Sequence, residues 1–159
     1  LGIKYGHCYT MTDVNGLHLN REISGTYQSG GDIDNLIFRV CKSTDDCSGN
    51  QGQFVPDDGT WYLQDQLGSR GGKGPGWFGN ISPHMGIVEA NRADRAAKFK
   101  GEGFCMFGDC AICLRLTDSG LSAPCPMGAI SDKAHIGRAS NPNNCKAYRF
   151  QEVKCVKGV

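Results

Sequence analysis

Apolar and polar residues alternate over short stretches of this chain, and each stretch ends in turn residues. The alternation is clearest around Phe38, Phe99 and Phe150, each of which shortly precedes a cysteine. A period of two residues is typical of strands that bury one face in a core. The segment from Val88 to Phe99 has the best helical period and could form one short helix or a turn. The pattern therefore predicts an all-β protein, with helix below about 15% of the chain.

Three segments of the chain share a strand followed by a turn that begins with Asp and ends with Gly. These turn pairs are Asp13 with Gly16, Asp65 with Gly68, and Asp118 with Gly120. Both intervals between successive glycines are 52 residues, although the third turn is one residue shorter. Asp begins such turns by accepting backbone hydrogen bonds, and Gly adopts the positive φ that ends them. The three aspartates are expected to begin equivalent turns around a pseudo-threefold axis.

Three units of this length resemble a β-trefoil, an architecture in which hairpins close into a small barrel without exposed edges. We therefore expect a small disulfide-stapled, β-trefoil-like barrel. Another small β-barrel, a β-sandwich or a mixed α+β fold remains open as an alternative.

Length and charge narrow the class of protein. The chain has 159 residues, 23 of them glycine, and a formal net charge of +1. That length suits one domain spanning 1–159, expected to be a monomer, and the balanced charge does not favour nucleic acid as a partner. No apolar run approaches the roughly 18 residues of a membrane span, so no membrane partner is expected. Residues 1–5 lack the apolar stretch of a secretion signal, so we expect an already processed form.

Nine cysteines in a chain of this size favour an oxidising, extracellular environment, and their odd number leaves one without an intramolecular partner. Cysteines at the junctions between the three units suggest the bonds Cys41–Cys47, Cys105–Cys110 and Cys8–Cys155, the last of which joins the two chain ends. Counted from the turn glycines, Cys113 takes the position of Tyr9 and Trp61, which predicts a buried free thiol. The fourth bond is then expected between Cys125 and Cys145.

The sequence gives little support for metal or catalytic chemistry. The C-x-x-C of Cys110 and Cys113 lacks a second ligand pair, and the histidines share no ligand spacing, so no metal or cofactor is expected. The glycine-rich stretch 69–74 departs from the phosphate-binding loop pattern at two positions. A paired-carboxylate hydrolase, or a nuclease using His84 and His135, stays possible, but no catalytic residue is assigned and we lean against an enzyme.

The segment from Gly68 to Pro83 is the candidate binding loop, because its glycines and prolines leave little means of forming regular structure. It places the cations Arg70 and Lys73 close to the adjacent aromatics Trp77 and Phe78. Trp and Arg are frequent anchors of interfaces, which makes these four side chains the predicted binding residues. In the alternative interpretation, Trp77 folds back as a lid over one end of the barrel.

The segments Phe38–Cys41, Asp58–Leu63 and Phe150–Cys155, together with the cysteine content, resemble the small secreted cysteine-rich proteins of fungi, including plant-pathogen effectors. The resemblance implies a secreted, extracellular, non-enzymatic protein that takes part in virulence by binding a host protein or a cell-wall glycan through surface loops. It supplies no functional residues. A small secreted hydrolase acting on glycan or RNA, or a protease inhibitor, on the same scaffold is the alternative.

Overall fold

The computed structural model of the protein describes residues 1–21, 25–30, 36–68, 75–80, 89–90, 92–106, 109–122 and 134–156, with the backbone alone described at 89–90, 104–106, 109, 121–122 and 134–135. The strands are β1 (Cys8–Asp13), β2 (Leu19–Arg21), β3 (Tyr27–Ser29), β4 (Phe38–Cys41), β5 (Tyr62–Asp65), β6 (Gly76–Phe78), β7 (Glu89–Ala90), β8 (Phe99–Met106), β9 (Asp109–Leu116), β10 (Gly120–Ser122), β11 (Ala134–His135), β12 (Gly137–Ala139) and β13 (Lys146–Val153). Helical structure among the described residues is limited to the 3-10 turn η1 (Ala93–Arg95). The prediction of an all-β protein is confirmed.

Antiparallel pairing connects the longer strands one after another. β1 pairs with β4, β4 with β5, β8 with β9, β9 with β13, and β13 with β1. The start of β5 also meets the start of β8, because Trp61 and Phe99 exchange two backbone hydrogen bonds of 3.1 and 2.8 Å. β8 nevertheless lies at one edge of the eight-stranded sheet, whose strand order is β7-β6-β5-β4-β1-β13-β9-β8, because the Trp61–Phe99 contact is an isolated bridge.

The same register recurs at three places in this arrangement. A buried aromatic residue lies opposite the last residue of a neighbouring strand in the pairs Phe38 with Asp65, Phe99 with Leu116, and Tyr148 with Asp13. The same three aromatics also lie opposite Tyr9, Trp61 and Ile112, respectively. Tyr9 and Asp13, Trp61 and Asp65, and Ile112 and Leu116 are each four residues apart in the sequence, so the pairing register is equivalent at the three places.

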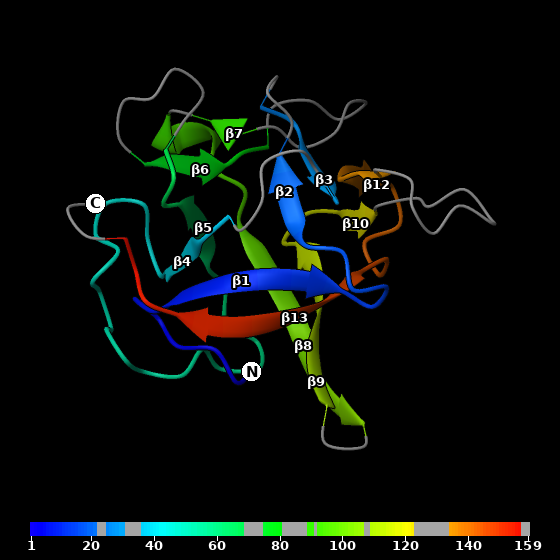
Figure 1. The fold of residues 1–159 in the computed structure, drawn as a ribbon, viewed down its shortest axis with the longest axis horizontal. Coiled ribbons are helices and arrows are strands. Elements are labelled where there is room, and N and C mark those ends of the chain that lie inside the picture. The colour runs from blue at the N-terminus through cyan, green and yellow to red at the C-terminus, as the bar shows by residue number, and fades with distance from the viewer. Residues whose placement is uncertain are drawn as a thin grey trace.

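A short antiparallel pair follows each of β1, β5 and β9 along the chain. These pairs are β2 with β3, β6 with β7, and β10 with β12. Figure 1 shows them gathered in the upper half of the molecule, above β1 and β13, whereas the β8–β9 hairpin extends past the opposite end. β11 adds a further strand beside β3.

Aromatic side chains dominate the core where the longer strands meet the short pairs. The ring of Phe78 stacks on that of Tyr27 with 4.1 Å between centroids, and it meets Phe99 edge-on at 5.1 Å. Phe38 lies 5.8 Å from Tyr27, and all four side chains are buried. Offset stacks and edge contacts of this kind stabilise a core beyond the burial of area alone. The short strands β3 and β6 thus carry core residues as well as the longer strands do.

The first two predicted turns have the expected form. Asp13 ends β1 and Asp65 ends β5, and Oδ1 of each accepts the N–H two residues later, at 2.9 and 3.1 Å. Gly16 and Gly68 then adopt φ of 83° and 93°, in the left-handed region that glycine enters without steric cost.

The third predicted turn differs from the other two. β9 ends at Leu116, so Asp118 lies two residues beyond the strand, where it forms an ion pair with Arg138 at 3.5 Å. Gly120 belongs to β10 rather than to the turn. The expectation that Asp118 begins an equivalent turn is therefore wrong: the register gives Leu116 the place of Asp13 and Asp65, four residues before Gly120 rather than the three that separate each aspartate from its glycine.

Two predicted disulfide bonds are confirmed. Cys8 is bonded to Cys155, with Cα atoms 5.2 Å apart, and Cys41 is bonded to Cys47, with Cα atoms 4.5 Å apart. The first closes 147 residues of chain, which is the geometry in which a cross-link restricts the unfolded chain most. Cys110 is also disulfide-bonded and lies opposite the backbone of Cys105 in the β8–β9 register. The side chain of Cys105 lies outside the described residues.

The fourth predicted bond and the predicted free thiol are corrected by the structure. Cys113 is bonded to Cys145, so it is not free and Cys145 does not bond to Cys125, which itself lies outside the described residues. The register shows that Ile112, not Cys113, takes the inward position equivalent to Tyr9. Counting from Gly120 misplaces this strand by one residue, and a shift of one residue exchanges the two faces of a strand.

Candidate functional site

A cleft among the described residues lies beside the long connection between β4 and β5, drawn cyan to teal in Figure 1. Its volume is about 610 Å³, within the roughly 300–1,000 Å³ of small-ligand sites. The lining residues come from the N-terminal segment, the β4–β5 connection and the residue before β8: Tyr5, Lys42, Asn50, Gln53, Phe54, Pro56, Asp58, Gly59, Thr60 and Lys98. We call this feature the β4–β5 cleft.

The first part of the β4–β5 connection is held by a disulfide and by an Asp-based turn. Cys47 is tied back to Cys41 at the end of β4. Asp46 Oδ1 accepts the N–H of Ser48 at 2.9 Å and its hydroxyl at 2.6 Å, which lowers the pKa of the Asp46 carboxyl. These contacts fix the first residues of the connection. Of the lining residues, only Lys42 lies within the disulfide-closed segment between Cys41 and Cys47.

The second part of the connection is hydrogen-bonded to the N-terminal segment. Tyr5 donates its N–H to the Gln53 oxygen at 2.9 Å and accepts the N–H of Gly52 at 2.8 Å. The Tyr5 hydroxyl donates to the carbonyl oxygen of Thr60 at 3.0 Å, and burial raises its pKa, so it remains a donor at neutral pH. The floor of the cleft is therefore preorganised by backbone contacts from both sides.

Phe54 is the apolar surface that this rigid frame presents to solvent. Its side chain is 62% exposed, although the next residue, Val55, is fully buried. The Lys4 ammonium lies 5.0 Å from the centre of the Phe54 ring, within the range of a cation–π contact. A single exposed aromatic residue is ordinary on a protein surface, but one that lines a cleft offers a ligand an apolar face to pack against.

Polar groups of several kinds surround the ring of Phe54. The Asn50 amide nitrogen donates to the Gln53 amide oxygen at 2.9 Å, which orients two amides along one wall. Lys42, Lys98 and Asp58 add two cations and a carboxylate to the lining. The cleft thus offers one aromatic platform together with donors, acceptors and charges, which suits a ligand that is polar at its edges and apolar on one face.

Two of the four binding residues predicted from the sequence, Trp77 and Phe78, are buried. Trp77 is 8% exposed and packs edge-on against Tyr62, with ring centroids 6.3 Å apart. Phe78 is a core residue. The expectation that at least one of these two aromatics is exposed is therefore wrong: both residues lie in β6, where neighbouring side chains point to opposite faces, and both are buried. Arg70 and Lys73 lie outside the described residues.

A smaller cluster of titratable groups lies on the surface of β1 and β13. His7 Nδ1 is 2.9 Å from Glu152 Oε1, and the Tyr9 hydroxyl donates to the same oxygen at 3.4 Å. Hydrogen bonding to His7 lowers the pKa of Glu152, and burial raises the pKa of Tyr9 to about 12. Because these contacts join residues near the beginning of the chain to a residue near its end, we interpret the cluster as a contact between the two chain ends.

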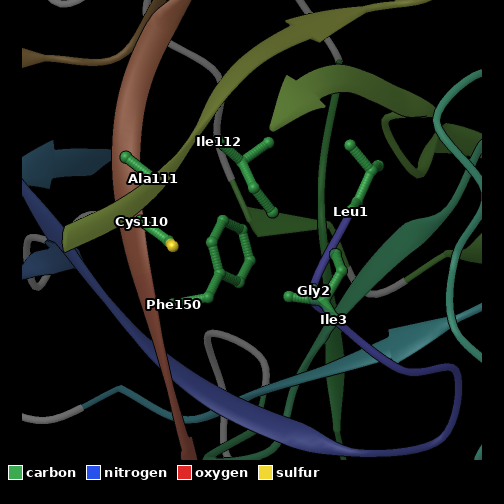
Figure 2. Close-up of a pocket in the computed structure, with 7 residues that line it drawn as sticks. All are labelled: Leu1, Gly2, Ile3, Cys110, Ala111, Ile112 and Phe150. Carbon is green, nitrogen blue, oxygen red and sulfur yellow. The ribbon is translucent and has the colours of Figure 1, made fainter. Parts of the chain in front are cut away.

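A second, smaller pocket is enclosed mainly by apolar side chains (Figure 2). Figure 2 shows Phe150 between the side chains of Ile112 and Ile3, with the sulfur of Cys110 directed toward the Phe150 ring. The pocket has a volume of about 60 Å³, which is too small for a drug-sized ligand. The β4–β5 cleft is therefore the stronger candidate site.

The residues of the β4–β5 cleft were not singled out by the sequence. In sequence order, Phe54 stands alone between Gln53 and Val55, with no second aromatic residue beside it. Asp57, Asp58 and Gly59 read as an ordinary solvated turn. A possible signal was a large aromatic residue next to several polar ones in a stretch with no strand alternation.

Comparisons with known proteins identify no relative of this chain: no protein-family model, curated protein or solved structure matches it. In the part of the chain that the structure describes, no helix is long and apolar enough to span a membrane. The same residues contain no cluster of His, Cys, Asp or Glu side chains that could hold a metal ion.

Proposed function

We propose that this protein is an extracellular, effector-like, non-enzymatic binding protein that engages a cell-wall glycan at the β4–β5 cleft. The single observation that carries the proposal is the exposed Phe54 ring in a preorganised cleft with oriented amides. A sugar ring has an apolar C–H face and a rim of hydroxyls that both donate and accept. The first suits an aromatic platform, and the second suits amides and a carboxylate.

The scaffold that we propose for this site is a β-trefoil. The three recurring registers, the short strand pairs after β1, β5 and β9, and the Trp61–Phe99 hydrogen bonds support it. Closing β5 onto β8 would leave no free edge among the six longer strands. On this scaffold, the β4–β5 connection joins the first unit to the second and projects from the barrel as a surface loop.

An extracellular location is supported by the disulfide bonds. Three bonds join described cysteines, and one of them ties together the two ends of the described chain. Such bonds persist in oxidising environments and are rare where thiols are kept reduced. The resemblance to secreted fungal proteins of the effector type agrees with this location and with a role at a host surface.

Removal of the aromatic platform tests the proposed function directly. Phe54→Ala should weaken glycan binding at least about tenfold, as expected for an aromatic anchor. Because the ring is largely exposed, the melting temperature should change by no more than about 2 °C. The measurement is co-sedimentation with insoluble cell-wall polysaccharides, followed by calorimetric titration with soluble fragments of any polysaccharide that binds.

Leu67→Ala is the matched control, because Leu67 is also an exposed apolar residue but lies beyond the opposite end of β5. It should leave binding unchanged. Equal binding by wild type and Phe54→Ala would exclude the cleft as the glycan site. Capture of a host protein by the wild type, with no polysaccharide bound, would replace the glycan with a protein partner.

A further inference from the structure

We infer that the β4–β5 cleft selects acidic glycans, whose carboxylate or sulfate groups pair with Lys42 and Lys98. This inference rests on the proposed function and names the chemical class of the glycan. It follows from the charges that line the cleft and from how few of them are neutralised within the protein.

Both lysines line the cleft and both are exposed. Neither ammonium group forms an ion pair in the part of the chain that the structure describes, although other basic side chains there do, including Arg21, Arg115 and Arg138. The cleft thus contains two cations whose partner is not supplied by the fold.

The backbones of the two lysines are held firmly. Lys42 directly follows Cys41, which is disulfide-bonded to Cys47. Lys98 directly precedes β8, and its carbonyl oxygen accepts the N–H of Thr117 at 3.0 Å. Their side chains therefore start from fixed points on two different segments that line the same cleft.

A third cation adjoins the aromatic platform. Lys4 contacts the Phe54 ring, as described above, and a sugar stacked on the exposed ring would bring its substituents near this ammonium group. Among the described residues that line the cleft, the two lysines face a single carboxylate, because Asp45, Asp46 and Asp57 belong to the same connection but do not line the cleft. Asp58 lines the cleft, whereas Asp57 lies 3.7 Å from the N-terminal amine and Asp46 accepts the hydrogen bonds of Ser48.

A neutral glycan would cover these ammonium groups without providing a negative charge. Removing a charge from water without a partner is costly, whereas an ammonium hydrogen-bonded to a carboxylate or sulfate is among the stronger polar contacts. The difference favours an acidic glycan over a neutral one of the same shape. It also predicts that salt weakens binding, because partly exposed charges are screened.

The sharpest test uses one polymer with and without its charge. Polygalacturonic acid and its methyl ester have the same backbone, so they differ chiefly in negative charge. We expect the acid to bind at least about fivefold more tightly at low salt and to lose that advantage near 1 M NaCl. Sulfated dextran and unmodified dextran provide the same comparison for sulfate and show which anionic group is preferred.

Charge-removing variants locate the effect on the protein. Lys42→Gln and Lys98→Gln should each weaken binding to the acidic polymer about threefold to fivefold, as for a partly exposed ion pair, and should leave binding to the ester unchanged. Lys154→Gln is the matched control, because Lys154 is an exposed lysine that does not line the cleft.

The two proposals fail in distinguishable ways. If the acid and the ester bind equally, and binding still depends on Phe54, the cleft binds glycans but does not select for charge, and only the present inference is overturned. If neither charged nor neutral polymers bind at low salt, the proposed function fails as well. Equal losses for Lys154→Gln and Lys42→Gln would attribute the effect to net charge and would also overturn the inference.

Discussion

The turn at Asp65 and the turn at Asp118 share one sequence pattern but differ in environment. Asp65 is fully buried: its carboxylate lies 3.0 Å from Arg21 Nε and accepts the Tyr27 hydroxyl at 2.9 Å. The Asp118 side chain is 65% exposed, and its ion pair with Arg138 lies at the surface. One aspartate anchors a strand pair to the core, whereas the other is a solvated turn residue.

The two environments differ because the third connection is one residue longer than the second. Leu116 lies four residues before Gly120, whereas Asp65 lies three residues before Gly68. Leu116, rather than Asp118, takes the register position that Asp65 takes in the preceding unit, opposite a buried aromatic residue. The third unit therefore places an apolar side chain where the second places a buried ion pair. An Asp shortly before a Gly indicates a turn. It does not show where the preceding strand ends or which of its side chains face the core.

The largest expected effect comes from breaking the buried pair. Asp65→Ala should destabilise the protein by about 3–5 kcal/mol, because it leaves the Arg21 guanidinium largely buried without its partner. Asp118→Ala should change stability by less than about 0.5 kcal/mol, as expected for an exposed ion pair. Urea denaturation at pH 7, with disulfides intact, measures both.

A double variant distinguishes the cost of leaving Arg21 without its partner from the contribution of the ion pair itself. Burial raises the pKa of Asp65, an effect that the Arg21 charge opposes, so the charged pair itself is costly to bury. Replacing both partners with apolar residues, as in Arg21→Met with Asp65→Leu, should recover part of the lost stability, because the Tyr27 hydroxyl and the Leu67 N–H still lose their acceptor. Equal free energies of unfolding for Asp65→Ala and Asp118→Ala would show that the buried ion pair contributes no more to stability than the exposed one.

Gly16 and Gly120, the glycines of the first and third predicted turns, also differ in what a larger residue would meet. A Cβ at Gly16 would meet open space, so Gly16→Ala costs only the strain of φ 83°, about 1 kcal/mol. A Cβ at Gly120 would overlap the backbone oxygen of Asn141 and crowd Asn144, so Gly120→Ala should cost about 2–3 kcal/mol. Thermal unfolding of the two variants measures the difference.

An asparagine variant distinguishes strain from crowding. Asn tolerates positive φ better than Ala, so Gly16→Asn should be close to wild type in stability. Gly120→Asn should be at least as destabilised as Gly120→Ala, because its side chain is larger. Similar losses at both positions would show that the 52-residue spacing does reflect equivalent sites.

Much of the fold could be predicted from local patterns, because strand alternation and turn residues act over a few positions. Such patterns predict the all-β class and the turns at Asp13 and Asp65. The bond between Cys8 and Cys155 is predicted instead from the placement of cysteines at the junctions between the three units. The partner of Cys113 could not be predicted this way. It depends on which face of β9 the residue occupies, and that is determined by pairing with β13, far along the chain.

The candidate site could not be predicted for a related reason. The sequence favoured Trp77 and Phe78 because they are adjacent, aromatic and flanked by glycines, but pairing of β6 with β5 buries both. Phe54 is exposed because hydrogen bonds to the N-terminal segment hold the chain extended here, so that Val55 faces the core and Phe54 faces outward. Exposure is a property of tertiary contacts, and no local pattern distinguishes the two cases.

The smallest expected effect concerns a carboxyl group that contrasts with Asp65 in its response to pH. Glu152 is exposed, and its hydrogen bond with His7 lowers its pKa below the ordinary value of 4.5, whereas burial raises that of Asp65 above 3.8. A lowered pKa adds stability above the unfolded-state value, and this is lost as pH falls through the folded-state pKa. A raised pKa acts in reverse: its contribution is present at low pH and is lost as pH rises through the folded-state pKa.

Titration of the side-chain carboxyl carbons by NMR should therefore place Glu152 below and Asp65 above their ordinary values. His7→Gln should move Glu152 back toward 4.5 and leave Asp65 unchanged, because the two carboxyls share no partner. A Glu152 titration that is unaffected by His7→Gln would show that the contact between the chain ends does not control this carboxyl.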